Sequence, residues 1–187
     1  MTDHAGLVPT DQATILEIAD GDRILRFDYR QALEFHKGNA YWGCALAFRM
    51  LQRAAGLLSR DGLWDRNRLR VTSGHPGPGV RDTLELVTGC VSSGRFSLDG
   101  GNREARCVGD MKYAWTLSDG TTEVSITLVD GLVPDAFLAL LDKIDREPAT
   151  AEEQAQLEAF KQEMTDRIWQ MTLEQAFPDS GIQVRSL

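Results

Sequence analysis

Side chains suited to metal binding or catalysis are scarce in this sequence of 187 residues. The chain has three histidines and three cysteines: His4, His36, His75, Cys44, Cys90 and Cys107. No two cysteines form a CxxC pair and their number is odd, so the sequence predicts neither a disulfide framework nor a zinc ribbon. A metal site built from imidazole and thiolate therefore has few possible compositions, and any cysteine chemistry must come from single thiols that meet in space.

A second candidate is the backbone-rich run Gly74-His75-Pro76-Gly77-Pro78-Gly79, in which His75 is the one functional side chain. The run precedes a predicted helix, and the free N–H groups at the start of a helix attract anions. Two prolines lack an N–H and weaken this cradle. The loop would bind a carboxylate or phosphate if nearby cations converge on it, whereas the alternative is that these cations are solvated. The residues predicted to bind such a ligand are Asn39, Tyr41, Gly77, Gly79, Arg81, Asp82 and Lys112.

Helices and strands must position these residues, and hydrophobic periodicity predicts where they lie. Two extended pieces over 14–27 flank a turn at 20–22, and a helix over 29–37 follows, with Asp28 as its N-cap. The helix predicted over 39–59 contains many small residues, which let another backbone approach closely. A strand at 69–73 leads into the glycine-rich run. A third helix begins near Val80 and reaches about Cys90.

The second half of the chain is predicted to continue with strands and then helices. Strands are expected at 96–98, 106–108, 113–117 and 123–129, the last two as a hairpin, followed by helices over 134–145 and 150–177. We therefore expect an α+β fold with a mixed or antiparallel sheet packed against helices. The expected organisation is a flexible arm at 1–13, a core domain at 14–146, and an acidic amphipathic helix and tail at 147–187. The apolar stripe of that helix needs a partner, either its own domain or a second copy in a homodimer.

Two segments resemble a known family. Phe35-His36, Gly43 and Ala45-Leu46-Ala47-Phe48-Arg49 resemble the Phe-His-Gly-His-x-Cys-Pro-Gly-x-Ala-Leu-Gly-Tyr-Arg opening of the FmdE family of formylmethanofuran dehydrogenase components. The run over 82–90, which ends in Thr88-Gly89-Cys90, is similar to that family's Asp-Ala-Ile-Gln-x-x-Thr-Gly-Cys, and the run over 112–117 is similar to its Gly-Lys-x-Ala-Phe-Thr-Phe strand. The resemblance covers roughly residues 28–130 and keeps the order of the motifs.

This resemblance implies a dimeric α+β domain that binds a metal, commonly zinc. It also implies a link to one-carbon chemistry, in which a molybdenum or tungsten oxidoreductase interconverts carbon dioxide and a formyl carrier, so an oxidoreductase of this kind is a possible partner. The chain departs from the family at its second His and at two Cys positions, and it lacks the C-terminal zinc ribbon. The residues at those three positions are Asn39, Tyr41 and Gly79.

Of the metal ligands that the resemblance implies, only His36 and Cys90 are present at matching positions of this chain. His75 is the candidate third ligand. A helix over 80–90 would be roughly 15 Å long, which would separate His75 from Cys90 unless the loop folds back. Each of the three also has a structural interpretation, as a helix-terminal cap or a buried residue. Asp82 either caps its helix or orients a ligating His, and Tyr41 with Trp42 forms either a pocket wall or ordinary core.

The formal net charge of −8 and a pI near 4.9 argue against a sequence-blind nucleic-acid binder. No apolar run approaches the roughly 20 residues that span a bilayer, and the first residues do not resemble a signal peptide, so we expect a cytoplasmic protein without a membrane partner. Three functions fit: a zinc-dependent enzyme, an accessory or sensor module that docks through its acidic helix, and a metal-free relative that binds a small anionic ligand with the loop at 74–79.

Overall fold

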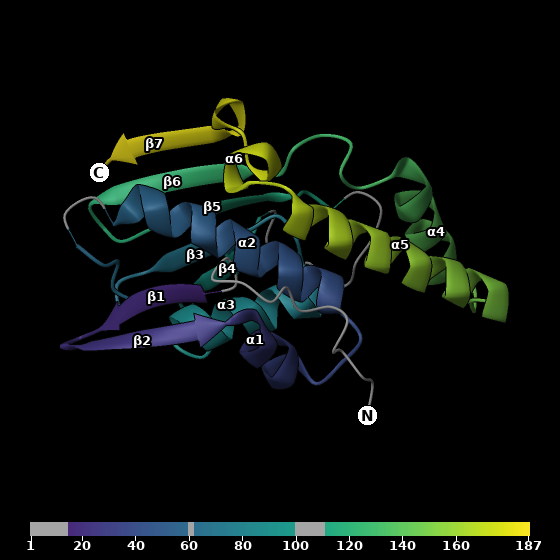
Figure 1. The fold of residues 1–187 in the computed structure, drawn as a ribbon, viewed down its shortest axis with the longest axis horizontal. Helices are drawn as coiled ribbons and strands as arrows, with labels where there is room; N and C mark the ends of the chain where they lie inside the picture. The colour runs from purple at the N-terminus through teal and green to yellow at the C-terminus, as the bar shows by residue number, and fades with distance from the viewer. Residues whose placement is uncertain (1–14, 60–61, 100–110) are drawn as a thin grey trace.

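The computed structural model describes residues 15–59, 62–99 and 111–187. The flexible arm predicted at 1–13, the strand predicted at 106–108 and Cys107 lie outside these residues. Within them, a two-stranded hairpin and a five-stranded sheet surround a central helix (Figure 1). This arrangement confirms the α+β fold that the sequence predicts.

The first elements follow the sequence closely. Strands β1 (Ile15–Asp20) and β2 (Arg23–Asp28) form an antiparallel hairpin, and helix α1 (Tyr29–His36) starts directly after it. Asp28 accepts the Gln31 N–H while the Gln31 side chain accepts the Asp28 N–H, so a capping box fixes the start of α1. Lys37 then ends the helix in the left-handed conformation, with φ of 54°.

Helix α2 (Tyr41–Leu58) is the centre of the core. Its side chains from Tyr41 to Leu51 are all buried, and it packs against α1, α3, α5 and the sheet. In Figure 1 it crosses in front of the five-stranded sheet. A helix that is apolar nearly all round must be covered on every side, and the remaining elements provide that cover.

The five-stranded sheet has the order β4-β3-β5-β6-β7. The strands are β3 (Arg70–Ser73), β4 (Phe96–Leu98), β5 (Ala114–Ser118), β6 (Thr122–Thr127) and β7 (Ile182–Ser186). β3 and β4 are parallel, joined by helix α3 (Pro78–Thr88), and the other pairs are antiparallel. The sheet is therefore mixed, as expected. β7 was not predicted as a strand, so the predicted C-terminal tail supplies one edge of the sheet.

The C-terminal helices pack on the same core. They are α4 (Asp135–Arg146), α5 (Ala151–Gln170) and the short α6 (Leu173–Ala176). The sequence predicts one helix to about 177, but a capping box between Thr172 and Gln175 separates α6 from α5. Met164 and Ile168 of α5 are fully buried, and α5 packs against α2. The apolar stripe that favoured a homodimer thus finds a partner within its own chain.

Candidate functional site

Two of the predicted site residues, His36 and Asp82, meet where three helices come together. His36 is the last residue of α1, Ala40 precedes α2, and Asp82 lies in the second turn of α3. The Nδ1 atom of His36 lies 2.7 Å from Asp82 Oδ2, and the Ala40 N–H donates to His36 Nε2 at 3.2 Å. One imidazole therefore joins the end of α1 to the starts of α2 and α3. We call this group of three residues the helix junction.

The hydrogen bonds of the helix junction indicate which ring nitrogen of His36 carries the proton. Because the Ala40 N–H donates to Nε2, that nitrogen carries no proton, and Nδ1 donates its own proton to Asp82. In metal sites, a ligating His commonly donates one ring N–H to a carboxylate and binds the metal with the other nitrogen. Here that other nitrogen faces a backbone N–H, and a Cβ atom placed on Gly38 would lie 2.7 Å from it. The backbone of 38–40 therefore closes around the only nitrogen that a metal would use.

Gly79, which stands where the FmdE motif has Cys, has a packing role in this structure. A Cβ atom on Gly79 would lie 2.2 Å from the Ala40 carbonyl oxygen and 2.9 Å from the Cys44 backbone nitrogen. A Cβ atom on Gly43 would lie 3.2 Å from the Val80 nitrogen. The backbones of α2 and α3 thus touch at two glycines, which confirms the close approach that the small residues of 39–59 predict.

Cys44 also lies beside the helix junction, although we did not predict it as a site residue. It is fully buried between α2 and α3. Burial raises the pKa of its thiol to about 12, an effect that the neighbouring Thr83 hydroxyl partly offsets. The thiol is therefore protonated at neutral pH, whereas a metal ligand or nucleophile would need the thiolate. Its position within a run of small residues was the available signal, but that run does not identify the facing helix.

Three further predicted ligand residues have structural contacts or lie at the surface. Tyr41 is buried, and its hydroxyl donates to the Glu158 carbonyl of α5 at 3.2 Å. The backbone carbonyl of Tyr41 accepts from the Tyr29 hydroxyl at 3.1 Å. This contact supports the interpretation of Tyr41 as a core aromatic. Asn39 is exposed, and its carbonyl lies 3.4 Å from the Lys161 ammonium. Arg81 is exposed on α3.

The glycine-rich loop is folded inward around His75. The Ser73 hydroxyl donates to the His75 carbonyl and accepts the His75 N–H, and the Gly77 N–H donates to His75 Nδ1 at 3.0 Å. The imidazole packs edge-on against Tyr113 and lies nearly parallel to Trp115. Burial lowers the pKa of His75 to about 4, so the ring is neutral at pH 7. Residues 75–77 are buried, so this part of the loop does not form an open anion cradle.

The third predicted metal ligand lies at the other end of α3. The helix ends at Thr88, Gly89 adopts the left-handed conformation, and Cys90 follows outside the helix rather than inside it. The 11 residues of α3 span about 16 Å and separate His75 from Cys90. Among the described residues, no three His, Cys, Asp or Glu side chains converge as a metal site requires. The residues at these positions do not fit the zinc that the resemblance implies.

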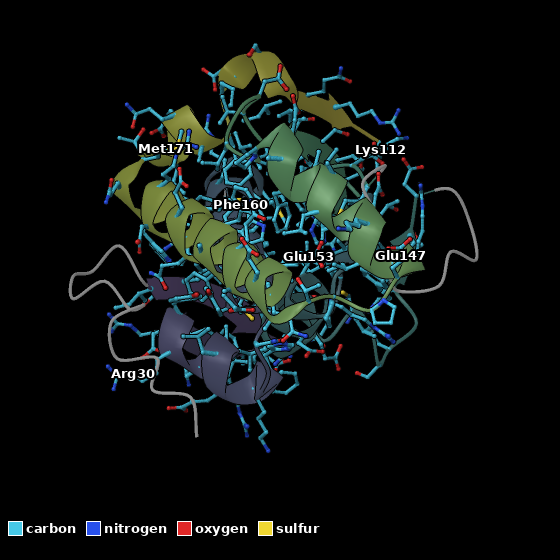
Figure 2. All side chains as sticks on the ribbon, turned by 90° about the vertical axis from the view of Figure 1, so that its right-hand side faces the viewer. Arg30, Lys112, Glu147, Glu153, Phe160 and Met171 are labelled. Atoms are coloured by element: carbon cyan, nitrogen blue, oxygen red, sulfur yellow. The ribbon has the colours of Figure 1, made fainter. Side chains whose placement is uncertain are left out.

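Lys112 lies on the solvent side of the loop. The Lys112 backbone N–H donates to the Gly74 carbonyl at 3.2 Å, and the Lys112 ammonium is 2.9 Å from Asp99 Oδ2. A Cβ atom on Gly74 would lie 2.8 Å from the Lys112 Cβ, so glycine permits this approach. In Figure 2, Lys112 and Arg30 of α1 lie on opposite sides of the molecule. The predicted ligand residues are therefore divided between the α1 side and the Lys112 side.

Comparison with known proteins gives no further assignment. No protein-family model matches the chain, and no curated protein sequence matches it significantly. Within the described residues, no helix is both long enough and apolar enough to cross a membrane.

Proposed function

We propose that this chain is a divergent FmdE-like domain that binds a small anionic ligand without a metal. The observation that carries the metal-free part is the pair of hydrogen bonds at His36. Asp82 occupies one ring nitrogen and the Ala40 N–H occupies the other. A metal at Nε2 would have to displace a backbone N–H that holds the start of α2.

The proposal of ligand binding is supported by the N-terminal end of the glycine-rich loop. Residues 75–77 are buried, but Gly74 is half-buried and adjoins the exposed Lys112. Of the cations that sequence analysis assigned to the ligand, Lys112 adjoins Gly74, whose carbonyl accepts the Lys112 backbone N–H. The Gly74 N–H is already bonded to the Ala114 carbonyl, so the Lys112 ammonium is the group beside Gly74 that can donate to a carboxylate or phosphate.

Metal content tests the metal-free part of the proposal. The full chain, purified without a histidine tag and incubated with zinc before gel filtration, is expected to hold well below one metal per chain. Treatment with a chelator should leave its thermal unfolding midpoint unchanged, because no binding energy is coupled to folding. His36→Ala is expected to lower stability without changing metal content. Near-stoichiometric zinc that is lost in His36→Ala or His75→Ala would overturn the proposal and support the zinc-enzyme alternative.

A further inference from the structure

The strands of the large sheet direct apolar side chains toward α2 and polar side chains toward the other face. On β5 and β6, Trp115, Leu117, Val124 and Ile126 are buried, while the residues between them are half-buried. The strand registers align these polar residues in a row across all five strands. That row is Ser97, Thr72, Thr116, Ser125 and Gln183. The face opposite α2 therefore carries a band of hydroxyl groups.

Next to this band the sheet is hollowed. Gly74 follows β3 and donates its N–H to the Ala114 carbonyl, and Ala114 pairs with Thr127. Gly74 has no side chain, and Ala114 has only a methyl group. Taller groups surround them, leaving a hollow of about 210 Å³. Its polar lining residues are Thr72, Asp99, Thr116, Ser125 and Thr127.

The hydrogen bonds at and beside the lining leave hydroxyl donors available next to this hollow. The Thr72 and Ser97 hydroxyls lie 2.9 Å apart, and the Thr116 and Ser125 hydroxyls 3.1 Å apart. Each pair uses one hydroxyl hydrogen and leaves the other available, since every hydroxyl carries one. Lys112 adds an ammonium at the Asp99 side, where its contact with Asp99 takes one of three N–H groups.

We propose that this hollow binds a small oxyanion, a carboxylate or a phosphate group. Hydroxyls can donate to such a group and the Lys112 ammonium can only donate, so the complement is a negatively charged acceptor. The ion pair of Lys112 with Asp99 carries no net charge, so Asp99 does not repel the anion strongly and Lys112 contributes through its remaining N–H groups. The volume is below the roughly 300 Å³ at which drug-sized sites begin, so the ligand has few atoms or inserts one anionic end. The inference deepens the proposed ligand binding and rests on it, but places the site on the sheet face rather than in the loop.

Titration of the full chain with sodium formate and with inorganic phosphate tests this site. Amide chemical shifts in NMR spectra report binding during each titration. Saturable shifts are expected at Gly74, Ala114 and Thr116 with at least one of the two anions. The two arms distinguish a carboxylate from a phosphate site. No saturable shift with either anion would overturn the proposal.

Variants decide whether the hollow itself is responsible. Ala114→Leu fills the hollow and Lys112→Gln removes the charge, and each should weaken binding at least tenfold, while Lys112→Arg should retain most of it. Ala155→Leu on exposed α5 and Lys37→Gln at the end of α1 are matched controls that should bind like the wild type. Circular dichroism checks that each variant is folded. Binding unchanged by Ala114→Leu would overturn the site, whereas stoichiometric zinc with intact anion binding would overturn only the metal-free function.

Discussion

His36 Nδ1 and Asp82 Oδ2 lie 2.7 Å apart although 46 residues separate them in the sequence. With the Ala40 N–H on the opposite ring nitrogen, this contact makes one side chain the link among α1, α2 and α3. The His36 side chain is only 8% exposed, so little water competes for its two hydrogen bonds. We therefore expect the contact between His36 and Asp82 to contribute mainly to the stability of the fold.

A double-mutant cycle tests this link. His36→Ala removes both hydrogen bonds and should lower the free energy of unfolding by about 2–3 kcal/mol, whereas Asp82→Asn keeps an acceptor and should cost about 1 kcal/mol. In the double variant the two effects should fall short of additivity by about 1 kcal/mol, because without His36 there is no hydrogen bond left for Asp82→Asn to weaken. Urea denaturation measures all four proteins. Strict additivity would show that the two residues do not interact in solution.

Gly79→Ala tests the close contact between α2 and α3. The new Cβ would lie 2.2 Å from the Ala40 carbonyl oxygen, a backbone atom that cannot rotate away. We expect a loss of about 3 kcal/mol or more in unfolding free energy, since the two helices must separate. Gly56→Ala is the matched control, because nothing lies within 4 Å of a Cβ there and the residue is inside α2. It should stabilise the protein by about 0.5–1 kcal/mol. Equal effects at both positions would contradict the contact.

Local signals explain why much of the fold was predictable. The Asp28 capping box, the glycine turn at 20–22 and the periodicity of α2 each act within a few residues, and each predicted element is present. β7 was missed because its residues are mostly exposed and become a strand by pairing with β6, some 60 residues earlier. The break between α5 and α6 had a signal, the Thr172–Gln175 capping box, which the continuing apolar stripe obscured.

The candidate site was less predictable because it depends on which helix ends meet. The sequence indicated His36 and Asp82 as separate candidates, with Asp82 orienting a ligating His as one interpretation, but their contact depends on α1 and α3 packing together. The hollow depends on strand register, which sets Gly74 beside Ala114. Alternation within β5 indicates which residues share a face but not which residues of β3 they adjoin.

The buried His75 predicts an acid-sensitive contribution to stability. Its folded-state pKa of about 4 lies below the unfolded value of about 6.5, so the unfolded chain binds a proton more readily. This contribution is complete above about pH 6.5 and is lost as the pH falls toward 4, by about 3 kcal/mol in total. His75→Asn retains an acceptor for the Gly77 N–H but does not titrate. In urea denaturation, the advantage of the wild type over this variant should shrink across that range. A constant difference would contradict a buried neutral imidazole.

The packing of α5 within its own chain predicts stability that does not depend on protein concentration. Ile168 is fully buried on the side of α5 that faces the core, so Ile168→Ala should cost about 2–4 kcal/mol through the lost side-chain volume. Because the contact lies within one chain, the cost should be the same at about 1 µM and about 100 µM protein, whereas a contact between two copies would strengthen with concentration. Ile24→Ala, at a side chain 66% exposed on β2, is the control and should change stability by less than about 0.5 kcal/mol. A cost for Ile168→Ala that appears only at the higher concentration would mean that this face of α5 packs against a second copy instead.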